Sequence, residues 1–396
     1  MKIAFLCSSL EPGQDGVGDY TRRLASELIR QGHPCLVVAL NDALVTQAMF
    51  ETQESEGTSV SVLRLPRSDS WDQRLVEARN CLDRFRPDWV SFQFVTFSYH
   101  RKGLCHGLGK KLTAINSQVP WHVMLHELWL GLGERTPFKH RVLGALQRIF
   151  IRDMIRRLRP LVVHTQADPY RQVLSREKIP ASVLPLISNV PFVKGDGWSD
   201  LLEPMLAGVI GQTPDRSKFY LAGIFGAVHP EWNAQEAVNL ILPLVQRFQK
   251  RLVLVFAGRN NLAAESLTEL KSSLRDRADI VIVGEKSALD ISRIFQTLDI
   301  GLATSPRQMI QKSGSVAALL EHGLPVLVTR DDWRVSGADL QPDVSSSRLL
   351  SPKQFGLLNA LPIRDAEAAS DSRLEQVAKQ FLASLKSASF SKSSST

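Results

Sequence analysis

Short apolar runs alternate with helical periods along most of the chain, and this alternation constrains the fold more than any other feature. The runs are apolar nearly throughout, as expected for parallel strands buried on both faces. They predict strands over residues 3–7, 35–40, 59–63, 89–94, 121–125, 161–164, 220–225, 252–257, 280–283, 300–303 and 326–328. Apolar spacings of three and four predict helices over 19–31, 71–85, 104–115, 137–157, 233–249, 262–274, 288–298 and 314–322. Strands that alternate with helices build βαβ units, so the fold class is α/β with open parallel sheets.

The alternation falls into two series, separated by a stretch that contains proline and glycine. We therefore expect two Rossmann-like, doubly wound domains that face each other across a cleft. The expected parts are a first domain at 1–190, a linker at 191–216, a second domain at 217–365, and a terminal helix with a frayed tail at 366–396, the helix itself spanning 366–385.

The composition is that of a globular protein. The chain has 396 residues, of which 44% are hydrophobic and 22% charged, with a formal net charge of +8. No apolar run approaches the roughly 18 residues of a membrane-spanning helix, and the first apolar run is too short for a secretory leader. No Cys-x-x-Cys spacing occurs, so we expect buried, reduced thiols in a cytoplasmic protein for all four cysteines, Cys7, Cys35, Cys81 and Cys105.

Much of the positive charge lies in one segment, from Phe138 to Leu161. The segment carries one acid, Asp153, and seven bases: Lys139, Arg141, Arg148, Arg152, Arg156, Arg157 and Arg159. It reads as an amphipathic helix, with two interpretations open. Either it packs on the core with a solvated outer face, or its basic surface meets anionic lipid or a phosphate-bearing acceptor. The second interpretation places the protein at the inner face of the membrane. Nucleic acid is not expected, because no aromatic residues interleave with the bases.

The loop after the first strand contains Gly16 and Gly18, with Asp19 as the expected N-cap of a helix that ends at Gly32. The amides of such a helix start attract a phosphate or a sugar hydroxyl. A purely structural tight turn is the alternative.

The same loop also resembles part of a dinucleotide fingerprint. That fingerprint requires a third glycine where Thr21 stands and an acid at the end of the second strand, near Asp42. A nicotinamide-dependent oxidoreductase is therefore a further hypothesis.

His126 and Glu127 follow the strand predicted at 121–125. Residues just past a parallel strand line the ligand crevice, where a histidine can hydrogen-bond sugar hydroxyls and the glutamate can orient it. The alternative is a histidine packed at a strand end. His122 lies four residues before His126, but a His-Glu-x-x-His motif is absent and the run is a strand, so no metal is expected.

The second half contains a candidate anion site. Gly226, His229 and Trp232 follow its first strand, and later Lys312 and Ser313 precede a helix that begins at Gly314 and Ser315. Backbone amides, hydroxyls, the helix dipole and the ammonium group all favour an oxyanion there, and Arg307 could add a second cation. An ordinary serine cap beside an exposed lysine is the alternative.

At these residues the chain resembles the glycosyltransferases of family 4, retaining nucleotide-sugar-dependent enzymes with the GT-B fold. The resemblance covers residues 1 to about 330. It rests on four segments: G-V-G-D-Y-T-R-R-L-A-S-E-L-I-R-Q-G-H, the pair H-E, A-G-R at 257–259, and I-S-R-I-F-Q-T-L-D-I-G-L-A-T-S-P followed by A-A-L-L-E-H-G-L-P-V.

The resemblance implies a hexosyltransferase-type enzyme of polysaccharide biosynthesis that needs no metal or other cofactor. It would move a sugar from a nucleoside-diphosphate donor to a hydroxyl of a glycan, lipid-linked or small-molecule acceptor. It implies catalytic roles for His126 and Glu127, and an acceptor loop of Gly16, Val17 and Gly18. The donor-binding residues it implies are Gly226, His229, Arg259, Gly284, Glu285, Arg307, Lys312, Ser313, Gly314 and Ser315.

The chain departs from the family pattern in two places. Ile310 and Ala318 stand where most members carry the two glutamates of Glu-x7-Glu. The loop holding His229, Glu231 and Trp232 lacks the arginine and lysine that grip the donor diphosphate in the family. These departures motivate a second hypothesis, a non-catalytic scaffold or binding protein of the same architecture.

Overall fold

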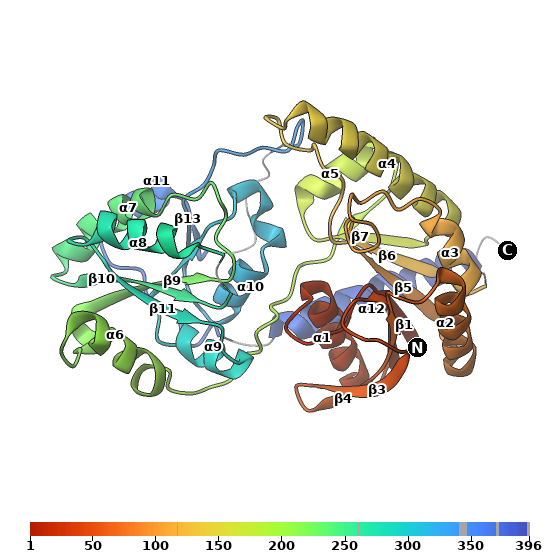
Figure 1. The fold of residues 1–396 in the computed structure, drawn as a ribbon, viewed down its shortest axis with the longest axis horizontal. Coiled ribbons are helices and arrows are strands. Elements are labelled where there is room, and N and C mark those ends of the chain that lie inside the picture. The colour runs from red at the N-terminus through yellow and green to blue at the C-terminus, as the bar shows by residue number, and fades with distance from the viewer. Residues whose placement is uncertain (117, 260, 340–346, 370–371, 394–396) are drawn as a thin grey trace. The chain divides into compact units, whose positions relative to one another are not determined.

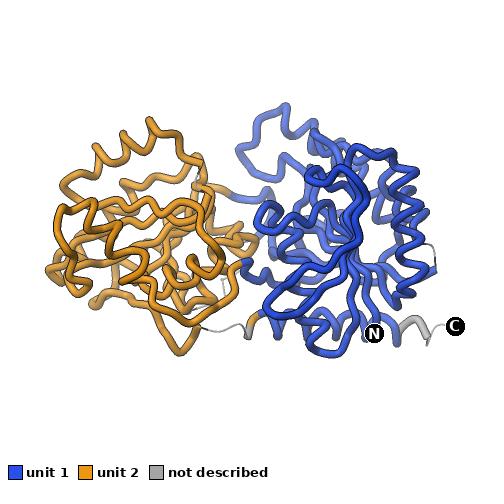
Figure 2. Tube along the Cα trace, turned by 60° about the horizontal axis from the view of Figure 1, so that its bottom comes forward, with its two compact units in different colours: residues 1–189, 334–339, 374–396 blue, residues 190–333, 340–373 orange. Residues whose placement is uncertain are grey.

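The computed structural model describes residues 1–116, 118–259, 261–339, 347–369 and 372–393. The chain divides into two compact units (Figure 2). Unit 1 comprises 1–189, 334–339 and 374–396, and unit 2 comprises 190–333 and 340–373. The segment 191–216, expected as a linker, instead contains a helix that belongs to unit 2, and the C-terminal helix belongs almost entirely to unit 1.

Unit 1 contains an eight-stranded sheet in the order β3-β4-β2-β1-β5-β6-β7-β8. Several of its strands are labelled in Figure 1. Its strands are β1 (Ile3–Cys7), β2 (Cys35–Asp42), β3 (Met49–Ser55), β4 (Thr58–Pro66), β5 (Trp89–Phe94), β6 (Trp121–Leu125), β7 (Val162–Thr165) and β8 (Ser182–Val183). All neighbouring pairs are parallel except β3 with β4. The strands β1, β5 and β6 are buried along their whole length, which explains why their sequences are mainly apolar.

The helices of unit 1 are α1 (Gly16–Arg30), α2 (Trp71–Phe85), α3 (Leu108–Ile115), α4 (Phe138–Leu158), α5 (Asp168–Arg176) and α12 (Ser372–Ser393). The last of these returns from far along the chain to cover the sheet. Its Phe381 stacks on Phe5 of β1, with ring centroids 5.8 Å apart, and meets His122 of β6 edge-on at 5.0 Å.

Unit 2 contains a six-stranded sheet in the order β11-β10-β9-β12-β13-β14, with every pair parallel. The strands are β9 (Phe219–Phe225), β10 (Arg251–Ala257), β11 (Asp279–Gly284), β12 (Ile300–Ala303), β13 (Val326–Val328) and β14 (Leu349–Leu350). The helices are α6 (Glu203–Ile210), α7 (Ala234–Arg247), α8 (Ala264–Leu274), α9 (Ala288–Phe295), α10 (Gly314–Glu321) and α11 (Pro352–Gly356). In chain order the strands run 3-2-1-4-5-6, which is the Rossmann order.

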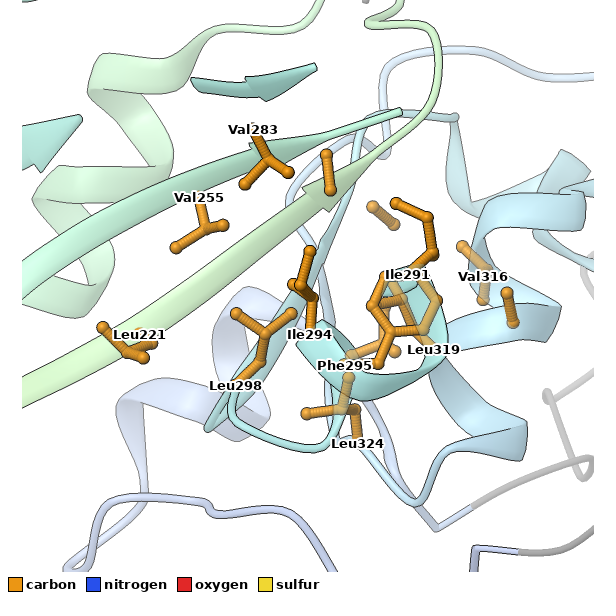
Figure 3. Close-up of a cluster of buried hydrophobic side chains, with 14 of the residues drawn as sticks. Leu221, Val255, Val283, Ile291, Ile294, Phe295, Leu298, Val316, Leu319 and Leu324 are labelled. Atoms are coloured by element: carbon orange, nitrogen blue, oxygen red, sulfur yellow. The ribbon is translucent and has the colours of Figure 1, made fainter. Parts of the chain in front are cut away.

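Alternate residues of the unit 2 strands build a core on each face of the sheet. On one face, Leu221, Val255 and Val283 pack against residues of α9 and α10, which point toward them in Figure 3. On the other face, Tyr220 and Leu254 pack against α7, α8 and α11. A sheet covered on both faces is doubly wound, as the apolar strands predict.

Every strand expected from the sequence is present, as are the helices between the strands. The edge strand β3 was missed because five of its seven residues, on both faces, are polar, and α6 because its segment contains proline and glycine. Leu202 and Leu206 of this segment are buried in the core of unit 2. The terminal helix begins later than expected, at Ser372, and continues to Ser393, while 370–371 of the expected range lie outside the described residues.

The four cysteines are free thiols and buried, as expected. Among the helices of the described residues, none combines the length and apolar content needed to cross a bilayer.

Candidate functional site

Each sheet reverses its strand order beside its first strand, between β1 and β5 in unit 1 and between β9 and β12 in unit 2. Ligands of open parallel sheets bind outside the carboxyl ends of the strands at such a reversal. The residues after these four strands are therefore the candidates, and the two units are described in turn.

In unit 2, Gly226 follows β9 and brings the end of this strand against the start of α10. Its φ of +74° is a left-handed conformation that favours glycine. A Cβ atom at this position would lie 3.2 Å from Oγ of Ser315, the second residue of α10. From the sequence we expected both segments at the donor site, and the structure brings them together.

The start of α10 combines a serine cap with a preceding lysine. Ser313 is the N-cap, and its hydroxyl accepts the amide of Val316 at 3.4 Å. Of the first-turn residues, Gly314 is exposed and Ser315 is half-buried, and Lys312 immediately precedes the cap. Helix-start amides and the helix dipole attract negative charge, and the ammonium group adds to that attraction.

Ile310 and Ala318, which stand in place of the family's two glutamates, are core residues. Ile310 is 3% exposed and Ala318 is fully buried, and both belong to the cluster under α9 and α10. These two positions therefore supply no carboxylate to the site.

The loop after β9 is held by an arginine that sequence reasoning missed. Arg330 follows β13, is 5% exposed, and donates to His229 Nδ1 at 2.6 Å, to Glu231 at 2.6 Å and to Asp332 at 2.7 Å. Burial and the neighbouring Arg330 lower the pKa of His229, so its imidazole is neutral. Two carboxylates share one guanidinium, which leaves this cluster with a net negative charge.

Four other expected donor residues also lie at this end of unit 2. Arg259 and Glu285, which follow β10 and β11, form an exposed ion pair at 2.8 Å, and this pairing lowers the pKa of Glu285. Gly284, which ends β11, adopts a φ of +71°. Arg307 is tied to the Arg330 segment through its main chain, since its amide donates to the Arg330 carbonyl at 2.8 Å. Trp232 is a core residue whose Nε1 donates to Thr329.

In unit 1, the first loop uses its amides internally. The helix α1 begins at Gly16, so Asp19 is not the N-cap as expected. The N-cap is Asp15, whose Oδ1 accepts the amides of Val17 at 3.0 Å and Gly18 at 2.7 Å. Gly18 permits close packing, since a Cβ there would lie 2.5 Å from the carbonyl oxygen of Ser9. The amides of Val17 and Gly18 therefore serve the cap.

Asp42, the acid invoked for a dinucleotide, is enclosed. Its carboxylate is fully buried and accepts the amides of Leu10 and Leu44 and the Arg64 Nε at 2.8 Å. Despite its burial, these hydrogen bonds hold the pKa of Asp42 below its ordinary value. A carboxylate saturated in this way is not placed to hold a ribose, which removes the main support for an oxidoreductase.

His126 lies at the carboxyl end of β6 and is 4% exposed. Its Nε2 is 2.9 Å from Oε1 of Gln93, and its ring meets Tyr20 edge-on at 5.1 Å. Within the described part of the chain, the buried hydroxyl of Tyr20 has no hydrogen-bond partner. The neighbouring Glu127 is half-buried. Tyr20 and Gln93 were missed, although a glutamine in an otherwise apolar strand is a signal in the sequence.

His122 and His126 have different hydrogen-bond partners. It lies in the interior, bonded to Ser91 and His164. No cluster of three or more metal-binding side chains occurs among the residues that the structure describes.

The basic helix α4 ends at Leu158, one residue past the predicted end at 157 and before the end of the basic segment at Leu161, because Arg159 adopts a left-handed φ of 45°. Its core face consists of Gly144, Gln147, Ile151, Met154 and Leu158. Four apolar side chains of this helix are exposed, by 44–80%: Phe138, Val142, Leu146 and Ile149.

No protein-family model matches the chain, and no curated protein matches it by sequence. Solved structures do match its fold. HepE from Anabaena, in complex with UDP and glucose, is 16% identical with a TM-score of 0.53, and the match covers 100% of both chains. A glycosyltransferase from Rickettsia africae is 12% identical with a TM-score of 0.57 over 98% of each chain.

A third match is a putative UDP-N-acetylglucosamine 2-epimerase from Listeria monocytogenes, 12% identical, with a TM-score of 0.51 over 98% of this chain and 96% of that one. At these identities the likeness establishes the fold. The expected class, α/β with two Rossmann-like units as in GT-B proteins, is confirmed. Activity has to be argued from the site, because one fold carries many activities.

Proposed function

We propose that the protein is a glycosyltransferase that transfers a sugar from a nucleoside-diphosphate donor to a hydroxyl acceptor. The observation that carries this proposal is the close approach of Ser315 to Gly226, which leaves little room for a side chain there, at the strand-order reversal of unit 2. It leaves a helix start, a serine hydroxyl and a preceding lysine beside the point where Rossmann sheets bind phosphates. The solved complexes of HepE with UDP and glucose, and with UDP-glucose, support a nucleotide sugar as the ligand class.

In this proposal the diphosphate lies on residues Lys312 to Ser315, with the base near Gly284 and Glu285. Charge that develops on the leaving phosphate is stabilised by amides and the ammonium group, which are already in place before the reaction. The resemblance to family 4 adds retention of configuration, with the departing phosphate taking the acceptor proton and no metal. The protein then acts mainly by positioning and by charge stabilisation.

Calorimetric titration with UDP, UDP-glucose, GDP, ADP and NAD tests this proposal. We expect one of the three nucleoside diphosphates, that of uridine, guanosine or adenosine, to bind. We expect NAD not to bind, because Asp42 is enclosed. We expect Lys312→Ala to weaken that binding by about tenfold, as for loss of one charge-assisted contact. The control is Lys271→Ala, an exposed lysine on α8. Equal affinities of wild type and Lys312→Ala would remove Lys312 from the site.

A non-catalytic nucleotide-sugar-binding protein is the second candidate. The buried Ile310 and Ala318, together with the negative cluster around Arg330, favour it, because they remove charges that the family uses at the donor. Release of UDP from UDP-glucose in the presence of an acceptor mixture separates the two, since a binding protein retains affinity without turnover.

We further propose that the protein meets an anionic membrane surface through α4. Phe138, Val142, Leu146 and Ile149 recur at spacings of four, four and three, so they lie on one exposed face of the helix. Seven bases of the segment surround them, partly compensated by Asp153 and Glu177. An exposed apolar stripe between cationic side chains is the arrangement of a helix that lies in the plane of an anionic interface.

The expected result is cosedimentation with vesicles of phosphatidylcholine and phosphatidylglycerol, and much weaker binding to phosphatidylcholine alone. Replacing Leu146 and Ile149 by serine should lower the bound fraction by about tenfold or more, because each buried aliphatic side chain contributes about 1.5–3 kcal/mol. Neutralising Arg152, Arg156 and Arg157 should lower it as well.

The matched control is Leu357→Ser, a 73% exposed leucine of unit 2. If the α4 variants cosediment as the wild type does, α4 is a solvated face.

A further inference from the structure

A chain of buried polar side chains leads from His126 into the interior of unit 1. His126 Nε2 is 2.9 Å from Gln93 Oε1, and Gln93 Nε2 is 2.7 Å from Ser91 Oγ. Ser91 Oγ is 2.7 Å from His122 Nδ1, and His122 Nε2 is 3.0 Å from His164 Nδ1. None of the five residues is more than 4% exposed. The chain crosses the three adjacent strands β5, β6 and β7.

The chemistry of the Gln93 amide group fixes the direction of the first two hydrogen bonds of this chain. A carbonyl oxygen only accepts, so the contact with Gln93 Oε1 requires a hydrogen on His126 Nε2. The amide nitrogen of Gln93 donates to Ser91, whose hydroxyl is also hydrogen-bonded to His122 Nδ1. His122 Nε2 and His164 Nδ1 share one hydrogen between them.

The far end of the chain is closed. The ring of Phe381 lies 5.0 Å from His122 and 6.5 Å from His164. In the described part of the structure, His164 Nε2 has no hydrogen-bond partner. Burial lowers the pKa of both histidines, so both rings are neutral.

This arrangement is less stable than an apolar core of the same shape, since a buried polar atom without a partner costs about 1–3 kcal/mol. At the end nearer the candidate site, the chain of hydrogen bonds ends at the ring of His126, which packs against Tyr20 with its buried hydroxyl.

We propose that Gln93, Ser91 and His122 are positioning residues that hold His126 in the tautomer with its hydrogen on Nε2. In that tautomer Nδ1 is the acceptor of the ring, so a hydroxyl bound to it would donate its hydrogen. This inference deepens the proposed function. It also rests on it, because the proposed function identifies the hydroxyl as that of a sugar. The tautomer itself is a property of the protein without ligand.

Nitrogen NMR of protein labelled with 15N-histidine tests the proposal, because a ring nitrogen with hydrogen and one with a lone pair resonate far apart. His126 is assigned by the signal lost in His126→Gln. In the wild type we expect hydrogen on Nε2 alone. In Gln93→Met, which removes the acceptor, we expect both tautomers. Gln93→Glu should restore the single tautomer, since a carboxylate oxygen also accepts at Nε2.

Ser91→Ala should mix the tautomers as well, because it frees the Gln93 amide to turn around. The control is Val123→Ala, a buried residue of β6 outside the chain of hydrogen bonds, which should leave the His126 signals unchanged. Hydrogen on Nδ1 in the wild type, or a single unchanged tautomer in Gln93→Met, would overturn the proposal. A failure to bind any nucleotide sugar would leave this measurement untouched, so it would count against the proposed function alone.

Discussion

Replacing Gly226 by aspartate is expected to lower the affinity for a nucleoside diphosphate by about 100-fold, or about 2.7 kcal/mol. The new carboxylate would lie against the Ser315 hydroxyl and the start of α10, where it would take the place of a phosphate oxygen. Aspartate tolerates the left-handed backbone of this position better than most residues, so the fold should persist.

Gly211→Asp is the matched control for this experiment. Gly211 is the C-cap of α6 and has a φ of +76°, and a Cβ atom added there would meet no atom within 4 Å. Both variants therefore carry the same backbone strain and the same added charge. Calorimetry should find the loss of affinity only in Gly226→Asp, and a similar loss in both variants would argue against a phosphate beside Gly226.

Unit 1 is expected to lose stability when the pH falls from about 6.5 to about 4. Burial lowers the pKa of His164 from its ordinary value to about 4, and lowers that of His122 as well. The unfolded chain binds protons at these histidines below about pH 6.5, whereas the folded chain does not, so acid favours unfolding. A shift of that size at His164 alone corresponds to about 3 kcal/mol.

The measurement is the urea-unfolding free energy at about pH 7 and about pH 4.5. The double variant His122→Leu, His164→Leu should show a flatter pH dependence, whatever its absolute stability. His100→Gln replaces an exposed histidine and should keep the dependence of the wild type. If the double variant is as acid-sensitive as the wild type, the two histidines are not the source.

The strands and most helices could be predicted from the sequence because hydrophobic periodicity is local. The mainly apolar run of β5 predicted the limits of this strand without error, whereas the polar edge strand β3 has no comparable pattern. The start of α1 was misplaced by one turn, since Asp15 and Asp19 are both good caps by type. Only the backbone distinguishes them.

Part of the candidate site was also accessible. A helix start next to a lysine is readable in one segment, as at Lys312 to Ser315. Arg330 was not found, because it lies about 100 residues from the loop that it holds and only the sheet order brings the two together. Gln93 and Tyr20 converge on His126 for the same reason, from β5 and α1.

The return of α12 to the sheet of unit 1 has a consequence for biosynthesis. Until residues near Phe381 leave the ribosome, the side chains of Phe5 and His122 have no cover on that face. Unit 1 is thus synthesised first but completed last. While unit 2 is being translated, the nascent sheet of unit 1 has an uncovered face on which a chaperone can act.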